Sequence, residues 1–239
     1  MKVSVIIPVY NSESYLRECL DSVLTQSIEN MDILLLDDAS KDGSRAICDA
    51  YAAQYPCVRT FQLDHRGPGA ARNEGLRHAN GEYIVFADAD DYFSANESIQ
   101  KMTDTLDATG ADVAVGNYCR LWDGRILEAA KHSVFSGMDR GSGKFRYCGF
   151  FSLGTLSYVW GKAYRRSFLQ ECGFSFGNYE YSEDKFFNIQ CYVQGARYAF
   201  VEDVVFRVNN RTMKVESVAY KLSKKTEEKI MAMSWDDSA

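Results

Sequence analysis

The chain has 239 residues, of which 46% are hydrophobic and 25% are charged, a composition that excludes a protein that is disordered throughout. Its 27 basic and 33 acidic residues give a formal net charge of −6, which argues against broad binding of nucleic acids. The length fits one large α/β domain or two small ones.

Strand and helix patterns alternate through the first half of the chain. A continuous β-branched run predicts a strand buried on both faces at residues 3–9, and residues 32–36 predict a second buried strand. Further strands are predicted at residues 58–63, 82–86 and 111–115. Helical spacing of apolar residues predicts helices at residues 15–24, 46–55, 67–76 and 96–108, and Asn11-Ser12 offers a cap for the first. This alternation predicts an α/β fold whose central sheet is mostly parallel and is flanked by helices on both faces.

The chain is less regular from about residue 117 onward. Aromatic residues are concentrated between Phe145 and Phe206. They form either a second small core or the wall of a binding cleft. We expect one continuous domain made of residues 1–116 and 117–218, followed by a helical tail at residues 219–239.

Cysteine usage and hydropathy indicate the compartment. The seven cysteines are scattered and form no C-x-x-C pair, which fits neither a disulfide framework nor a structural zinc site. The N-terminal apolar run is too short for a signal peptide. No stretch approaches the roughly 20 apolar residues of a membrane span. We therefore expect a soluble, cytoplasmic protein.

Polar groups follow three of the predicted strands. They are Tyr10-Asn11, Asp37-Asp38 and Asp88-Ala89-Asp90-Asp91. Ligands of open α/β sheets bind outside the carboxyl ends of the strands, so adjacent strands would bring these groups into one crevice. Several carboxylates there would repel each other unless a cation neutralises them. The D-x-D pattern is therefore a candidate site for Mg²⁺ or Mn²⁺.

Several ordered motifs resemble those of family 2 glycosyltransferases. They are Val5–Asn11, Asp37–Ser44, Gly67–Leu76 and Ala79–Asp91, followed by Trp160–Arg166, Gly173–Phe176 and Glu183-Asp184. The resemblance covers about residues 1 to 190. It implies the GT-A fold, with a Rossmann-like sheet in the nucleotide-sugar-binding half (1–116) and a more irregular acceptor-binding half (117–218).

The resemblance also implies roles at the donor side. Asp90 matches the position that holds the metal, Mn²⁺ or Mg²⁺, and Asp88 lies beside it toward the ribose or the metal. Asp38 matches the position that hydrogen-bonds the base. The residues matching positions near the nucleoside are Pro8, Tyr10 and Asn11. For Arg72 two alternatives stand: it fixes the acidic site or the phosphates, or it forms a structural ion pair with an aspartate.

Asp184 matches the catalytic base of the family, which takes a proton from the acceptor hydroxyl. Without the resemblance, Glu183-Asp184 would be read as the N-terminus of a helix, where acidic residues are favoured by the helix dipole. We assign Glu183, Asp91 and Trp160 to the acceptor side or to a supporting shell around the site.

The resemblance implies an inverting, metal-dependent glycosyltransferase of the hexosyltransferase type. It would transfer a single sugar from a nucleoside-diphosphate sugar, with a UDP-sugar favoured, to a hydroxyl of a glycan or lipid-linked acceptor in surface polysaccharide synthesis. The Q-x-x-R-W motif of processive synthases is absent. Alternatives are a nucleotidyltransferase, whose glycine-rich basic loop is missing at residues 5–11, and a non-catalytic nucleotide-sugar-binding paralogue. No nucleic-acid partner is expected, and the sequence does not specify the oligomeric state.

Some positions depart from the family pattern. His65-Arg66-Gly67 stands where the family often has Asn-x-Gly. For Arg207 and Arg211 two alternatives stand: they close over the pyrophosphate, or they are surface arginines, which is the commoner outcome. The tail combines lysines with apolar residues. It either contacts an anionic membrane surface, which would place the protein at the inner face of the membrane, or packs its apolar side on the domain. Its acidic residues favour the second alternative.

Overall fold

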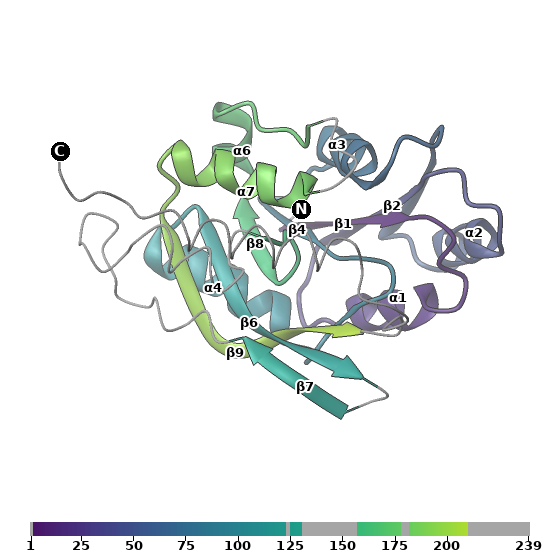
Figure 1. Cartoon of the computed structure of the whole chain (residues 1–239), viewed down its shortest axis with the longest axis horizontal. Coiled ribbons are helices and arrows are strands. Elements are labelled where there is room, and N and C mark those ends of the chain that lie inside the picture. The colour runs from purple at the N-terminus through teal and green to yellow at the C-terminus, as the bar shows by residue number, and fades with distance from the viewer. Residues whose placement is uncertain (1, 123–124, 131–156, 178–181, 210–239) are drawn as a thin grey trace, which may run out of the picture.

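Four parallel strands form one half of the central sheet in the computed structural model, which describes residues 2–122, 125–130, 157–177 and 182–209 (Figure 1). In spatial order they are β3 (Val58–Gln62), β2 (Met31–Asp37), β1 (Val3–Val9) and β4 (Tyr83–Phe86). They confirm the first four predicted strands. Val9 pairs with Asp37, so β1 and β2 end at the same level and their following loops lie side by side.

The sheet continues beyond β4 into a mixed region. Its strands are β8 (Lys162–Arg165), β6 (Val113–Trp122), β9 (Tyr198–Asn209), β5 (Tyr92–Phe93) and β7 (Arg125–Ala130). β8 is antiparallel to β4 and β6, whereas β9 runs parallel to β6 and antiparallel to β5. β7 pairs with β6 in an antiparallel hairpin. The predicted strand 111–115 is thus the beginning of a longer strand.

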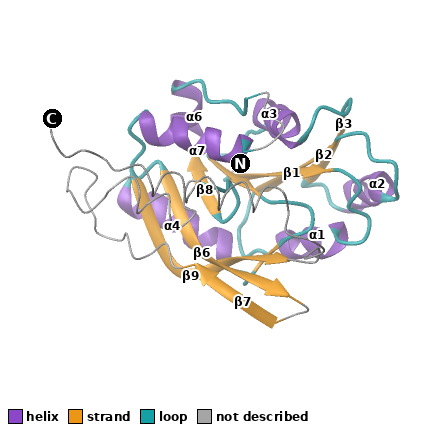
Figure 2. Ribbon diagram, viewed as in Figure 1, coloured by secondary structure: helices purple, strands orange, loops and turns teal. Residues whose placement is uncertain are grey.

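Helices cover both faces of the sheet, which confirms the predicted α/β fold (Figure 2). On one face lie α1 (Leu16–Leu24), α2 (Ser44–Gln54) and α4 (Ser98–Thr109). On the other lie α3 (Pro68–His78), α6 (Arg166–Glu171) and α7 (Glu183–Val193).

Alternate residues of β1 serve these two faces. Val5 and Ile7 belong to the core cluster that contains α1 and α2, whereas Ile6 packs in the cluster that contains α3 and α7. Successive side chains of a strand point to opposite faces, and both faces of this strand are covered. The continuous aliphatic run in the sequence follows from this double burial.

The predicted cap of the first helix is wrong. α1 begins at Leu16 with Tyr15 as its N-cap, and no side chain caps it. Asn11, in a left-handed conformation with φ of 49°, instead accepts a hydrogen bond from the Lys41 N–H at 2.8 Å. The Asn11 side chain is used to connect the loops that follow β1 and β2.

Some sequence predictions fall outside the described residues. These are the helical tail at residues 219–239 with its membrane contact, the aromatic residues of the cluster at positions 145–156, 179 and 181, and Arg211. The division at residues 116 and 117 stays a prediction, and β6 runs through that point.

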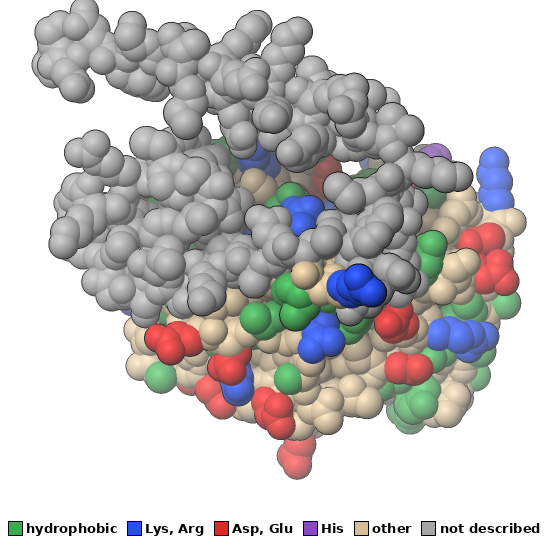
Figure 3. Space-filling view, turned by 60° about the horizontal axis from the view of Figure 1, so that its bottom comes forward, with side chains coloured by type: hydrophobic (Ala, Val, Ile, Leu, Met, Phe, Trp, Pro, Cys, Tyr) green, Lys and Arg blue, Asp and Glu red, His purple; other side chains and the backbone are tan. Residues whose placement is uncertain are grey.

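In the ranges that the structure describes, no helix is both long and apolar enough to span a bilayer. On the face shown in Figure 3, the acidic and basic side chains of the described residues are interspersed.

The close approach of α3 to the sheet gives a test of the packing. A Cβ atom added at Gly75 would lie 2.4 Å from Cγ2 of Ile6, which is fully buried in β1. We expect Gly75→Ala to lower the free energy of unfolding by about 1–3 kcal/mol, because overpacking outweighs the gain of about 1 kcal/mol in helix propensity. Urea unfolding followed by circular dichroism measures the change.

The control is the same change in an Ile6→Ala background, where the clash is removed. There Gly75→Ala should be neutral or stabilising, so the two substitutions should be strongly non-additive. Additive effects would show that Ile6 does not limit the approach of α3.

Candidate active site

The loops after β1 and β2 are joined at the carboxyl end of the sheet. The Asp38 N–H donates to the Val9 carbonyl oxygen at 2.8 Å, and the Asn11 N–H donates to Ser40 Oγ at 3.1 Å. Tyr10 is 43% exposed on this edge, and Pro8, two residues before it, is partly buried. The structure therefore brings together the three residues that the sequence predicts near a nucleoside.

Asp38 anchors the loop that leads into α3. Its buried carboxylate accepts hydrogen bonds from the backbone N–H groups of Arg66 and Gly67, each at 2.9 Å. It also contacts Nδ1 of His65 at 2.9 Å, and the imidazole stacks on the Tyr10 ring with centroids 4.3 Å apart. His65 thus lies beside the predicted base-binding residues. The sequence pointed to His65 only because His65-Arg66-Gly67 differs from the Asn-x-Gly that the family often has there.

The acidic turn after β4 holds Asp88, Asp90 and Asp91 in three different environments. Asp88 is partly buried and Asp90 is exposed. Asp91 is buried and accepts a hydrogen bond at 2.8 Å from the Asn209 N–H, at the end of β9. Burial, together with the charges of Asp88 and Asp90, raises the pKa of Asp91 to about 9.

The donor set of this turn fits a hard divalent cation. Among the described residues, no group of three or more metal-ligating side chains is already assembled. Mg²⁺ and similar ions, however, are commonly held by one or two carboxylates together with substrate phosphates. Asp90, with Asp88 beside it, matches that arrangement. The negative charges of Asp88 and Asp90, which raise the pKa of Asp91, would also favour a cation.

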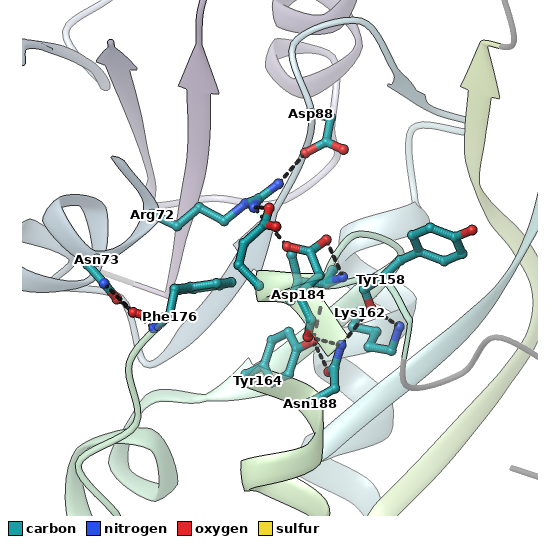
Figure 4. Close-up of polar contacts among 11 residues, drawn as sticks. Arg72, Asn73, Asp88, Tyr158, Lys162, Tyr164, Phe176, Asp184 and Asn188 are labelled. Atoms are coloured by element: carbon teal, nitrogen blue, oxygen red, sulfur yellow. Dashed lines mark hydrogen bonds and ion pairs between the residues drawn. The ribbon is translucent and has the colours of Figure 1, made fainter. Parts of the chain in front are cut away.

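Arg72 connects the acidic turn to α7. Its guanidinium, which is 3% exposed, donates to Asp88 at 2.7 Å, to Asp184 at 2.7 Å and to Glu183 at 2.9 Å (Figure 4). Burial alone would lower the pKa of Arg72, but Asp184, Asp88 and Glu183 raise it above the ordinary value. The sequence left two alternatives for Arg72. In the structure it forms ion pairs with acidic residues and holds them together.

Asp184 lies in the first turn of α7 and is buried. One carboxylate oxygen accepts from Arg72, and the other accepts from the Val159 N–H at 3.3 Å. Burial raises the pKa of Asp184 to about 6, with Arg72 acting against this rise and Asp88 and Glu183 adding to it. A carboxylate with this pKa is ionised at neutral pH and can accept a proton, as a general base must.

Comparison with known proteins matches this geometry to a family. The family model described as "Glycosyl transferase family 2" matches residues 4–173. The chain belongs to this family. Glycosyltransferase GlyA of Streptococcus pneumoniae is 27% identical over 212 residues, which cover 86% of this chain and 30% of GlyA.

Two further relatives of this glycosyltransferase chain are informative. The poly(ribitol-phosphate) beta-glucosyltransferase of Bacillus spizizenii is 38% identical over 120 residues, covering 48% of this chain and 19% of that protein. The crystal structure of S. aureus TarS 1-349 in complex with UDP has a TM-score of 0.73 at 26% identity, covering 87% of this chain and 60% of that chain. The chain spans less than two thirds of the length of each of these three proteins.

The glycosyltransferase family match and the fold confirm the GT-A assignment. The site residues Asp38, Arg72, Asp88 and Asp90 lie inside the matched range, whereas Asp184 lies beyond its end at residue 173. The roles assigned to these residues from the sequence stay predictions.

Trp160, assigned from the sequence to the acceptor side or a supporting shell, lies buried in the core of this glycosyltransferase. Its ring is 4% exposed and stacks between Tyr158 and Phe206, with centroids 4.4 and 5.3 Å away. Two buried polar residues near Asp184, Lys162 and Asn188, were not singled out from the sequence. The available signal for Asn188 was its place four positions after Asp184 on one helix face. The short β8, Lys-Ala-Tyr-Arg, gave no such signal for Lys162.

Removal of Arg72 tests the ion-pair network of the glycosyltransferase. We expect Arg72→Met to lower the free energy of unfolding at pH 8 by about 3–5 kcal/mol, because it leaves buried carboxylates uncompensated. At pH 5 the loss should be smaller, since carboxyl groups without the guanidinium have higher pKa values and become neutral by binding protons. Urea unfolding with EDTA at both pH values measures this difference.

The control is Arg77→Met, which removes an exposed arginine from the same helix. Its effect should stay within about 1 kcal/mol at both pH values. An equal loss of stability for Arg72→Met at pH 5 and pH 8 would contradict the network.

Proposed function

We propose that this chain catalyses transfer of a single sugar from a nucleoside-diphosphate sugar to a hydroxyl of a glycan or lipid-linked acceptor, with inversion and with a divalent metal. The observation that carries the proposal is the Arg72 network, which joins the D-x-D turn to the buried Asp184. A donor site and a candidate base thereby lie next to each other.

The donor side is supported by the edge of the sheet. The exposed Tyr10 ring, stacked on His65, offers an aromatic face to a nucleoside base, and Asp38 lies directly behind it. A bound Mn²⁺ or Mg²⁺ at Asp90 and Asp88 would neutralise the diphosphate and stabilise it as a leaving group. The likeness to TarS 1-349, solved in complex with UDP, favours a UDP-sugar donor.

Asp184 serves as the general base of the proposed reaction. It takes the proton of the acceptor hydroxyl, and the oxygen attacks the anomeric carbon from the face opposite the diphosphate. The new glycosidic bond forms as the bond to the diphosphate breaks, and the nucleoside diphosphate leaves with the electron pair. The Bacillus spizizenii relative, named as a poly(ribitol-phosphate) beta-glucosyltransferase, supports a surface polymer as the acceptor.

Replacement of the base separates catalysis from donor binding. We expect Asp184→Asn to lower UDP release from UDP-sugars with Mn²⁺ by about 10²–10⁴-fold, because proton abstraction is lost. UDP affinity, measured by calorimetry, should change little. In the unchanged protein, UDP release should fall as the pH drops through about 6, since Asp184 then becomes protonated.

Glu183→Gln is the matched control, because Glu183 lies in the same helical turn and also contacts Arg72. It should retain UDP release within about 10-fold. Wild-type turnover by Asp184→Asn would remove Asp184 from the role of base.

Metal dependence is tested at Asp90. We expect UDP and Mn²⁺ together to raise the melting temperature, and EDTA to abolish this effect. Asp90→Asn should weaken UDP binding in Mn²⁺ by about 10-fold or more, because a ligand to the cation is lost. Asp49→Asn, an exposed acid on α2, is the control and should bind normally.

UDP binding that is unaffected by EDTA would contradict the metal site. Release of pyrophosphate from a nucleoside triphosphate would instead indicate a nucleotidyltransferase. Donor binding by the unchanged protein without any UDP release would indicate a non-catalytic paralogue.

A further inference from the structure

A single peptide group lies between Asp184 and a buried lysine. Its N–H, that of Val159, donates to Asp184 Oδ2 at 3.3 Å. Its oxygen, that of Tyr158, accepts hydrogen bonds from Lys162 Nζ and, at 2.9 Å, from Asn188 Nδ2 (Figure 4). Because a trans peptide bond is planar, its C=O and N–H point in opposite directions. A group that fixes the position of the Tyr158 oxygen therefore also fixes the direction of the Val159 N–H.

Lys162 occupies an unusual place for a lysine. It begins β8 in the middle of the sheet, pairs in register with Val115, and is 2% exposed. Burial lowers the pKa of Lys162 to about 7, and the attraction of Asp184 acts against this fall. A buried amine is costly for the fold unless it is hydrogen-bonded, and the Tyr158 carbonyl provides that bond.

Asn188 is held so that its amide can reach the same oxygen. It lies on α7 and is 1% exposed. Its Oδ1 accepts a hydrogen bond from Tyr164 Oη at 2.8 Å, which turns the NH₂ group toward the Tyr158 oxygen. The same NH₂ group donates to the backbone oxygen of Asp184 at 3.1 Å. Asn188 thus ties the peptide group to the helical turn that carries Asp184.

We propose that Lys162 and Asn188 are positioning residues for Asp184: by holding the Tyr158 carbonyl oxygen, they aim the Val159 N–H at the Asp184 carboxylate. This inference rests on the proposed function, in which Asp184 is the base.

Two physical effects follow from this arrangement. The peptide N–H fixes one oxygen of Asp184 while Arg72 fixes the other, so the carboxylate cannot rotate freely. In addition, donation to the Tyr158 oxygen polarises the peptide and strengthens its N–H as a donor. A stronger hydrogen bond to the carboxylate favours the ionised form and keeps the pKa of Asp184 lower than burial alone would set it.

The titratable and charged groups around the pair come from several elements. Asp184 is faced by Arg72 from α3, by Asp88 from the turn after β4 and by Glu183 from its own helix. Lys162 is faced by Asp184 and by Cys191, both on α7. The test must therefore change Lys162 while leaving the Arg72 network intact.

Lys162→Met is the principal variant, because methionine has a similar volume and lacks the amine. We expect it to remain folded and at least as stable, since methionine fills the space and the cost of burying an amine is removed. The pKa of Asp184, followed by carboxyl ¹³C NMR, should rise by about 0.5 pH unit or more. UDP release from UDP-sugars in Mn²⁺ should fall by about 10-fold or more at pH 7, with UDP affinity unchanged.

Tyr164→Phe is the second variant and keeps the ring in place. It removes the hydroxyl that orients Asn188, so the pKa of Asp184 should move in the same direction by a smaller amount, with a smaller loss of rate. Thr103→Val, a fully buried polar residue of α4, is the control and should alter neither quantity.

The outcomes separate the two claims. If the unchanged protein releases no UDP, the proposed function fails, whereas the titration of Asp184 still tests the positioning by Lys162. If Asp184 titrates at the wild-type pH and the rate is unchanged in Lys162→Met, the inference is overturned. If Lys162→Met does not fold, unchanged titration and rate in Tyr164→Phe overturn it.

Discussion

The buried guanidinium of Arg72 is the contact on which the arrangement of the candidate active site depends. It reaches from α3 to Asp88 after β4 and to Asp184 on α7, two segments that are far apart in the sequence. Without this positive charge, the carboxylates would repel each other in a poorly solvated region. The Arg72 side chain thus links the N-terminus of α7, and with it the candidate base, to the turn after β4.

Neighbouring acids in this site behave differently because their surroundings differ. Asp90 is exposed, Asp91 is buried with a pKa near 9, and Asp184 is buried but paired with Arg72. Asp38 satisfies its charge with backbone N–H groups. A count of acidic residues treats all of them as equal negative charges. The folded chain gives each of them a different environment through burial and hydrogen bonding.

The parallel half of the fold was predictable because each of its strands is marked by a short pattern of neighbouring residues. Strands buried on both faces need unbroken aliphatic runs, and the polar residues that follow them mark the ligand-binding edge. The mixed half was not predictable in this way. The four-residue β8 inserts between β4 and β6, and long-range pairing decides its place. Lys162 escaped notice for the same reason, since only the register of β8 puts its amine in the interior.

Asp38 holds the loop before α3 mainly through backbone groups, so the loop does not depend on every side chain that it carries. Two of the bonds to its carboxylate come from the backbone N–H groups of Arg66 and Gly67. Substitutions of Arg66 other than proline keep the first donor, whereas Gly67, with φ of 88°, lies in a backbone region that favours glycine. The side chain at position 65, by contrast, lies against the Tyr10 ring. A change of side chain at position 65 therefore alters the surface beside the Tyr10 ring while these two backbone bonds continue to hold the loop.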